Sequence, residues 1–198
     1  SLDSIICMEL NILASKSPRR AYLLNQIGFK FSVIQSNFAE CLNTNLPPNA
    51  LAETLALGKA LKIAKNHRNN IIIGADTIVC HSDNAFGKPS NEQERINMLK
   101  YLSGKSHEVI TGVALIALNK GIEHTFNHRT IVKVKNITEE ELKIYSENFK
   151  GLDKAGGYGI QDGFSIFIEK IQGCYFNVMG LPLSSFYRHY KNVFKSFY

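Results

Sequence analysis

Short, continuous apolar runs alternate along the chain with stretches in which apolar residues recur every three or four positions. The runs Leu10–Ala14 and Ile71–Ile73 are short and largely apolar, and small or polar residues follow them, as they follow buried strands. Ala21, Leu24 and Ile27 follow a helical spacing instead, so we expect a helix that packs one face against a sheet. This alternation predicts an α/β protein.

Capping residues predict where the helices begin. Ser17 can cap a helix whose first residue is Pro18, because proline lacks only an N–H group that is not needed at that position. Two further helices are predicted to begin at the capping-box pairs Asn91/Glu94 and Thr138/Glu141, and the last helix is predicted to begin at Pro182. A long helix is predicted at about Ala50–His67.

A predicted hairpin makes the sheet mixed. Val109–Leu118 and Thr125–Val134 read as two strands around the turn Asn119–Gly121. We therefore predict a mixed twisted sheet flanked by helices. No repeat or linker interrupts the pattern, so residues 1–198 are predicted to form one domain, with two lobes around a cleft as the alternative arrangement. Further strands are predicted at Phe31–Gln35, Ile78–Cys80, Ser165–Ile171 and Tyr175–Met179.

The composition excludes disordered, collagen-like and mucin-like proteins, because 44% of the 198 residues are hydrophobic and 20% are charged. The four cysteines are far apart and form no C-x-x-C pair, so we expect reduced thiols and a cytoplasmic location. No apolar run approaches the roughly 20 residues that cross a bilayer, and Ser1–Asp3 lacks the basic start of a signal peptide. We expect no membrane partner.

The net charge of +6 is concentrated near the C-terminus. The bases and aromatic residues of Phe186–Tyr198 fit the two faces of an amphipathic helix, and they also fit a contact with a polyanion such as nucleic acid. We favour the helix and expect no nucleic-acid partner. No acid follows Glu169, whereas four bases do: Lys170, Arg188, Lys191 and Lys195.

Hydroxyl and guanidinium groups gather between the first predicted strand and helix, in Ser15-Lys16-Ser17-Pro18-Arg19-Arg20. A helix N-terminus presents unpaired N–H groups and the positive end of its dipole, and arginine adds bidentate donors for phosphate oxygens. The segment therefore suits phosphate, although a capped helix start with solvated arginines would have the same residues.

An acid follows the second predicted strand, in Gly74-Ala75-Asp76-Thr77. A carboxylate at the C-terminal end of a strand points into the crevice where ligands bind in α/β sheets, so Asp76 could hold Mg²⁺ or act as a general base. A carboxylate paired with a lysine or capping a turn is the alternative. Lys88, in Gly87-Lys88-Pro89, follows a turn that could bring it back over this strand end. Lys59, on the long helix, is either a further phosphate ligand or a solvated lysine.

A glycine-rich stretch, Asp153–Gln161, forms the third candidate segment. Its glycines allow close approach of the backbone to a ligand, and Gln161 offers both a donor and an acceptor, as recognition of a base edge requires. An irregular surface loop is the alternative. Motifs of other enzyme classes are absent from the sequence: there is no G-x-x-x-x-G-K-[ST], no H-E-x-x-H and no G-x-S-x-G.

Together and in this order, the motifs resemble those of the Maf family of nucleoside triphosphate pyrophosphatases. The resemblance extends over about Leu10–Phe186. The matching segments are Ser15–Arg20, Gly74–Thr77, Gly87–Pro89, Leu102–His107 with Thr111–Val113, Asp153–Gln161, and Tyr175–Leu183.

The resemblance implies an elongated, Maf/ITPase-like α/β fold with a deep central cleft, often as a homodimer. It implies cleavage of a nucleoside triphosphate between the α- and β-phosphates, with a divalent cation (Mg²⁺ or Mn²⁺) as cofactor. The ending Tyr158–Gln161 resembles the branch of the family that acts on dTTP and UTP.

The same resemblance makes Asp76 the proton acceptor and puts Arg19, Thr77 and Gln161 at positions linked to substrate choice. Asp76 and Glu40 are expected to bind the metal. Glu40 is the only acid that the chain keeps from an S-D-x-x-E-like stretch of its relatives. The triphosphate is expected to contact Ser15, Ser17, Arg19, Arg20 and Lys88, with Lys59 as a further candidate.

Two other functions fit the same residues. One is a non-catalytic regulator of septum formation, a process with which family members have been associated, that binds nucleotide or nucleic acid through the basic tail. Salt-dependent DNA binding without release of pyrophosphate would favour it. The other is a pyrophosphatase for inosine-type purine triphosphates, which a substrate panel would distinguish.

Overall fold

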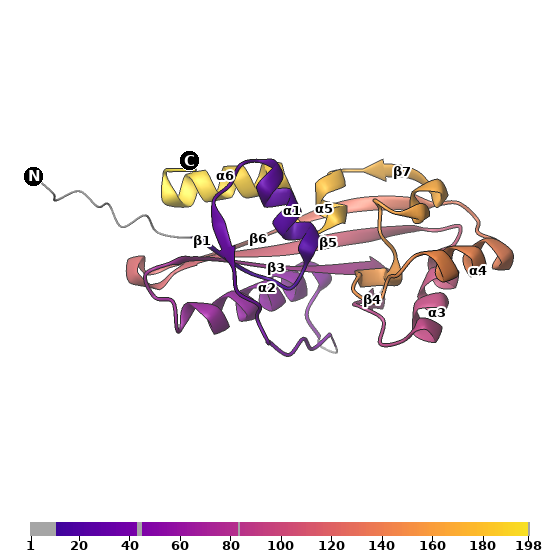
Figure 1. The fold of residues 1–198 in the computed structure, drawn as a ribbon, viewed down its shortest axis with the longest axis horizontal. Coiled ribbons are helices and arrows are strands. Elements are labelled where there is room, and N and C mark those ends of the chain that lie inside the picture. The colour runs from indigo at the N-terminus through magenta and orange to yellow at the C-terminus, as the bar shows by residue number, and fades with distance from the viewer. Residues whose placement is uncertain (1–10, 43–44, 83, 198) are drawn as a thin grey trace, which may run out of the picture.

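The computed structural model describes residues 11–42, 45–82 and 84–197, within which seven strands form one mixed sheet along an elongated molecule (Figure 1). The strands are β1 (Asn11–Ala14), β2 (Phe31–Val33), β3 (Ile71–His81), β4 (Asn84–Phe86), β5 (Ser106–Ala117), β6 (Ile122–Val134) and β7 (Ile168–Gln172). Their order is β2-β1-β3-β5-β6-β7, with β4 paired to β3. The expected mixed α/β fold is therefore confirmed.

The helices cover both faces of this sheet. In Figure 1, α1 and α6 lie on one face and α2 lies on the opposite face, while α3 and α4 lie together near one end. The α-helices are α1 (Pro18–Gln26), α2 (Pro48–Ala64), α3 (Glu92–Leu102), α4 (Glu139–Asn148), α5 (Tyr175–Met179) and α6 (Leu183–Phe194). The short 3₁₀ turns are η1 (Leu118–Lys120), η2 (Ala155–Gly157) and η3 (Gly163–Phe167).

The central strand β3 changes its partners along its length. It runs parallel to β1 from Ile71 to Gly74, and antiparallel to β5 from Ile72 to Cys80. Because β1 ends at Ala14, opposite Gly74, the next residues of β3 have no strand on that side until β4 joins at Val79. Asp76, which was expected at the end of a strand, lies inside β3 at this gap.

Small residues let α2 approach the sheet closely. A Cβ atom on Gly74 would overlap the carbonyl oxygen of Ala56, and one on Gly112 would overlap the backbone of Ala52. The helix can therefore lie directly on β3 and β5, which brings its polar residue Lys59 within reach of strand β3.

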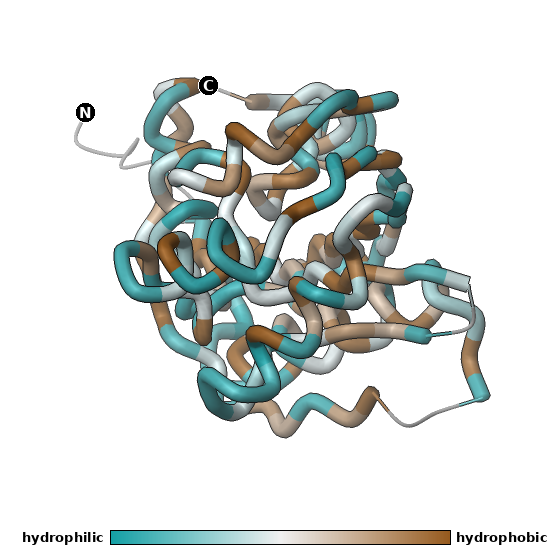
Figure 2. The backbone as a smooth tube through the Cα atoms, turned by 90° about the vertical axis from the view of Figure 1, so that its right-hand side faces the viewer, coloured by the Kyte–Doolittle hydropathy of each residue, from teal (hydrophilic) through white to brown (hydrophobic). Residues whose placement is uncertain are grey.

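The opposite face carries the largest apolar cluster. Leu13, Leu23 and Phe186 are fully buried there, between the sheet, α1 and α6. The apolar side of α6 faces this cluster while Arg188 and Lys191 are exposed, so the amphipathic C-terminal helix is confirmed. Figure 2, viewed along the molecule, shows the hydrophilic stretches running mainly along outer turns and loops.

Most of the predicted elements are present. The β5–β6 hairpin turns through η1, with Gly121 in the left-handed region at φ 63°. Thr138 and Glu141 form the expected capping box at α4. At α3, Asn91 accepts from the backbone of Glu94 as expected.

One predicted strand is wrong, because Tyr175–Met179 is the helix α5. Gly173 and Gly180, with φ of 128° and 122°, bracket the segment and reverse the chain on both sides. Inside this bracket the Asn177 amide is fully buried and donates to Val109 O and to Thr130 Oγ1, both 3.0 Å away. A strand in that place would not direct the amide at both acceptors.

Two smaller differences concern neighbouring segments. The strand expected from Ser165 begins only at Ile168, because Asp162 starts the 3₁₀ turn η3 by accepting from the backbone of Phe164. The strand β4 was not predicted. Cys80 and Cys174 are free thiols, as expected, and Cys41 is exposed, whereas Cys7 and Leu10 lie outside the described residues.

Candidate active site

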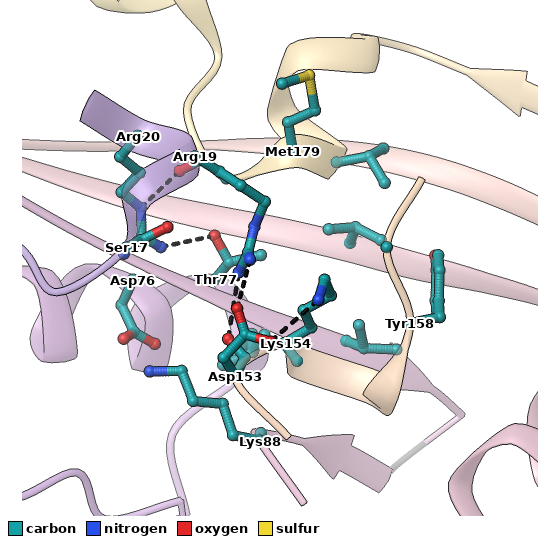
Figure 3. A pocket seen from close by; sticks show the side chains of 18 of the residues that line it. Ser17, Arg19, Arg20, Asp76, Thr77, Lys88, Asp153, Lys154, Tyr158 and Met179 are labelled. Atoms are coloured by element: carbon teal, nitrogen blue, oxygen red, sulfur yellow. Dashed lines mark hydrogen bonds and ion pairs between the residues drawn. The ribbon is translucent and has the colours of Figure 1, made fainter. Parts of the chain in front are cut away.

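A cavity of about 280 Å³ opens beside the gap in the sheet, and a smaller one of about 130 Å³ adjoins it. Figure 3 shows side chains from α1, β3 and the glycine-rich segment converging on the larger cavity. Every residue for which a role was expected lines one of the two: Arg19, Thr77, Asp76 and Gln161 line the larger, Ser15 and Lys59 the smaller, and Ser17, Arg20, Glu40 and Lys88 both.

Lys59 joins the two candidate metal ligands. Its ammonium contacts Asp76 Oδ1 and lies 2.7 Å from Glu40 Oε1. Lys59 and Asp76 are 7% and 5% exposed, so one buried cation faces two acids. Lys59 was expected at a phosphate or in solvent, and here it neutralises the carboxylates instead.

The two acids differ in their proton affinity. Burial raises the pKa of Asp76, against the opposing effects of Lys59 and Arg20. Burial also acts to raise the pKa of Glu40, but the hydrogen bond and charge of Lys59 and the charge of Lys88 lower it overall. Asp76 is therefore the better proton acceptor of the pair, and Glu40 is the more firmly ionised.

Arg20 holds three segments together. Its Nε donates to Gly180 O at 2.8 Å, one terminal nitrogen donates to Ser15 Oγ at 3.2 Å, and the other donates to Thr77 Oγ1 at 2.9 Å. The guanidinium is buried, which lowers its pKa. These contacts use three of its five N–H donors, so two are left for a ligand.

Arg19 instead reaches across the cavity to Asp153. One guanidinium nitrogen lies 2.6 Å from Asp153 Oδ2 and another donates to Asp153 O at 3.1 Å (Figure 3). Burial acts to raise the pKa of Asp153, but the bonds from Arg19 and Lys154 hold it at about 2. The ion pair therefore links the start of α1 to the opposite side of the cavity.

The start of α1 supplies the polar groups expected there. Ser17 precedes the helix, and its side chain makes no capping hydrogen bond. Its backbone N–H donates to Ser15 Oγ at 3.1 Å. Lys88 lies 4.0 Å from Glu40 Oε1 after the β3–β4 turn, as the spacing suggested, and burial lowers its pKa.

The segment of residues 151–161, called the wall loop below, forms the far side of the cavity. Its glycines bring the backbone close to its neighbours: Gly156 N donates to Gly87 O at 3.0 Å, and a Cβ on Gly156 would press on Val79. Tyr158 is buried and its hydroxyl lies 2.7 Å from Nε2 of His107. Gln161 lines the cavity and is exposed.

Sequence reasoning missed the partners that hold these groups. Gly180 O anchors Arg20, while Thr111 lies 2.9 Å from Thr77 and donates to Asn177 O at 3.2 Å. Both lie in segments matched by the family motifs, so the motifs pointed to the right regions but not to these contacts.

A divalent cation has a plausible place between Asp76 and Glu40. Lys59 contacts one oxygen of each carboxylate, and no donor among the described residues bonds to the other oxygen of either. The described chain contains no cluster of three or more His, Cys, Asp or Glu that could form a complete protein site. Two carboxylates completed by ligand oxygens are the usual donor set for Mg²⁺.

Comparison with known proteins adds independent information. A family model described as "Maf-like protein" matches residues 11–193. A dTTP/UTP pyrophosphatase of Bacillus cereus (strain AH820) is 48% identical over 184 residues, which cover 93% of this chain and 95% of that protein. The protein of the same name from Bacillus mycoides (strain KBAB4) is 46% identical with the same coverage. A solved HAM1 protein from Coxiella burnetii aligns over 64% of this chain and 73% of its own, with 15% identity and a TM-score of 0.44, a likeness too low to carry an argument.

Proposed function

The chain belongs to the Maf family, and from this membership we propose that it is a nucleoside triphosphate pyrophosphatase that hydrolyses dTTP and UTP to the nucleoside monophosphate and pyrophosphate. Relatives that bear the name dTTP/UTP pyrophosphatase and cover nearly the whole chain support the substrate.

One observation carries the proposal: the larger cavity has Asp76, Glu40 and Lys88 on one side, where Lys59 of the adjoining smaller cavity contacts both acids, and a glycine-rich segment with an exposed amide on the other. The first side offers charge to a triphosphate, and the second offers a donor and an acceptor to a base. A ligand that carries both groups fills such a cavity best.

The triphosphate binds at the start of α1. Ser17, Lys16 and Lys88 line both cavities, and Ser15 lines the smaller one. Backbone N–H groups at a helix start and cationic side chains favour phosphate oxygens. We assign the smaller cavity, which also contains Lys59, to the phosphates that leave as pyrophosphate.

Asp76 and Glu40 would hold a divalent cation, Mg²⁺ or Mn²⁺, and their two carboxylates fit such an ion. The ion would withdraw negative charge from the phosphoryl oxygens and thereby lower the barrier to attack.

Asp76 acts as the proton acceptor. A water molecule attacks the α-phosphorus, its proton passes to Asp76, and the bond from the α-phosphorus to the oxygen bridging to the β-phosphate breaks. The raised pKa of Asp76 suits this role, because a base near the working pH transfers protons most effectively. Lys59 and Arg20 keep the carboxylate in place.

Gln161 selects the base. Thymine and uracil present an N3–H donor between two carbonyl acceptors, which a glutamine amide can match by accepting once and donating once. Cytosine presents the opposite pattern at N3 and C4. When a base covers the Gln161 amide, a mismatch that leaves the amide unpaired costs about 1–3 kcal/mol, which corresponds to a preference of roughly 5- to 150-fold over CTP.

A pyrophosphate-release assay over dTTP, UTP, CTP, GTP and ITP, with Mg²⁺ and with Mn²⁺, tests the proposal. We expect dTTP and UTP to have the highest kcat/KM and pyrophosphate, not orthophosphate, to be the product. Equal rates for the pyrimidines and guanine nucleotides would disprove the selectivity, and preference for ITP would move the chain to the purine-directed function. Nucleotide binding without any release would contradict the enzymatic function.

We propose a homodimer, which the family resemblance supports, and a cytoplasmic location, which the widely spaced cysteines without a C-x-x-C pair support. None of the helices in the described part of the chain combines the length and apolar character needed to cross a bilayer. The single domain over residues 1–198 stays a prediction.

A further inference from the structure

Arg95, in the first turn of α3, belongs to no motif of the site and yet contacts the wall loop. We propose that Arg95 is a positioning residue. It holds the wall loop in a fixed position and thereby sets the placement of Gln161 and the selectivity for thymine and uracil over cytosine. The proposal rests on the proposed function, which it deepens by naming what makes the base-selecting segment rigid.

Arg95 is fully buried although it is charged. Its Nε donates to Gly157 O at 2.8 Å, and one terminal nitrogen lies 3.1 Å from Glu92 Oε2. The Glu92 side chain is 52% exposed, so the ion pair lies at the edge of the buried region. The other terminal nitrogen, Nη2, has no hydrogen-bond partner among the described residues.

Two glycines of the wall loop make room for this side chain. A Cβ on Gly151 would overlap Arg95 Nε and the carbonyl oxygen of Gly157, and a Cβ on Gly157 would lie 2.9 Å from Arg95 Cγ. Gly157 also has φ of 80°, where side chains are disfavoured. The loop therefore lies directly against the arginine.

Arg95 acts on both sides of Gln161 in the sequence, directly on Gly157 before it and through Tyr145 on Asp162 after it. Before it, the bond to Gly157 O fixes the turn η2, whose Gly156 also bonds to Gly87 beside Lys88. After it, the guanidinium lies 5.1 Å from the centre of the Tyr145 ring, and Tyr145 donates to Asp162 Oδ1 at 3.1 Å. Gln161 itself is exposed, so its position depends on these anchored neighbours.

The cost of burying this guanidinium argues against a role in filling space alone. A buried charge with an unmatched donor is unfavourable, and an apolar side chain of similar volume is often equally stable or more stable at such a place. An apolar side chain cannot donate to Gly157 O. The donor is what arginine adds here.

The test compares Arg95→Met with Arg95→Lys and with a control, Lys100→Met. Methionine keeps the alkyl volume and removes the donor, lysine restores one donor, and Lys100 is a cation on the same helix that pairs with Glu139 away from the wall loop. We expect Arg95→Met to lower the ratio of kcat/KM for UTP over CTP by about tenfold, the scale on which a lost charged hydrogen bond acts. Arg95→Lys should recover part of the ratio, and Lys100→Met should leave it unchanged.

A double-mutant cycle with Gln161→Ala separates positioning from general damage. If Arg95 acts through Gln161, the removal of Gln161 in the Arg95→Met background lowers the ratio by less than about threefold, against about tenfold in the wild type. Independent effects that multiply, or an unchanged ratio in Arg95→Met, would overturn the proposal. If Arg95→Met fails to fold, Gly157→Ala replaces it in the test, because the added Cβ would displace the same contact from the side of the loop. The same results would then support or overturn the proposal.

A readout without turnover keeps this test apart from the proposed function. Amide hydrogen exchange of residues 151–161 in the free protein should accelerate by about tenfold in Arg95→Met and not in Lys100→Met, because the loop would open locally more often. Unchanged exchange would refute the positioning role even in an active enzyme. A wild type without pyrimidine selectivity would instead refute the proposed function while the exchange result stands.

Discussion

The two sides of the cavity are built in different ways. On the phosphate side, Lys59, Asp76 and Arg20 come from α2, β3 and α1, and their side chains bond directly to one another or to adjacent backbone. On the base side, the wall loop is held by backbone carbonyls and close-packed glycines as well as by the side chains of Asp153 and Tyr158, while Gln161 is exposed.

The difference follows from what each side must do. Charges that act on a phosphoryl group need fixed positions and low exposure, because electrostatic effects are strongest where water is excluded. A base is recognised by one edge, so the Gln161 amide that recognises it needs only a correctly placed backbone. Substitutions on the phosphate side should therefore affect turnover most, and those on the base side should affect the choice of substrate.

The largest effect is expected for Asp76→Asn, which removes the proton acceptor while keeping the shape of the side chain. We expect kcat to fall at least about 10²-fold, the usual scale for a lost general base. Asp153→Asn, on the base side, should lower kcat by less than about tenfold. Steady-state kinetics with circular dichroism as a folding control test the pair, and equal losses would contradict the division between the two sides.

Adjacent arginines allow a comparison of stability. Arg20→Met removes the three hydrogen bonds that Arg20 donates to Gly180 O, Ser15 Oγ and Thr77 Oγ1, which should cost about 2–3 kcal/mol and lower Tm by about 4–10 °C. Arg19→Ala removes a partly exposed ion pair and should cost no more than about 1 kcal/mol, while kcat/KM falls about tenfold. Thermal unfolding of both variants measures this difference, and a Tm loss in Arg19→Ala as large as in Arg20→Met would count against it.

Gln161→Ala should act on selectivity more than on rate. We expect the ratio of kcat/KM for dTTP and UTP over CTP to fall by about tenfold. Without the Gln161 amide, bound cytosine no longer leaves an amide group of the protein unpaired. The kcat for UTP should change less than the ratio of kcat/KM. A variant that loses rate equally for all nucleotides would place Gln161 with the phosphate side.

The smallest effect concerns pH and His107, which is buried beneath the wall loop against Tyr158. Burial lowers the pKa of His107 to about 4 from a usual value of 6.5. Between pH 6.5 and pH 4 the unfolded chain therefore binds more protons than the folded chain does. The contribution of His107 to the free energy of unfolding is fully present above pH 6.5 and is lost as the pH falls towards 4.

Between pH 7 and 5.5 this decline should amount to about 1 kcal/mol. Urea unfolding at both pH values measures it, with His107→Gln as the control in which the pH dependence should be weaker by that amount. An identical pH dependence in the variant would show that other groups, such as His128 and His189, are responsible.

How far the sequence could predict this site depended on the kind of contact. The strand–helix order, the hairpin and the segment Ser15–Arg20 follow from local patterns, and their positions were predicted. The pairing of Lys59 with two acids and the anchoring of Arg20 by Gly180 depend on residues far apart in the sequence, which no local pattern contains. The strand predicted at Tyr175–Met179 was wrong for the same reason, because its aromatic and aliphatic residues fit a strand until the buried partners of Asn177 are known.

The bond between Arg20 and Gly180 has a consequence for the synthesis of the protein. The two residues are separated by 160 positions, so the ribosome adds the acceptor roughly 8–30 s after the donor at about 5–20 residues per second. Until then the phosphate-binding segment lacks the carbonyl that orients its buried arginine. Nascent chains that stop before Gly180 should therefore be unable to hydrolyse nucleotides, and the activity can appear only after Gly180 has been added.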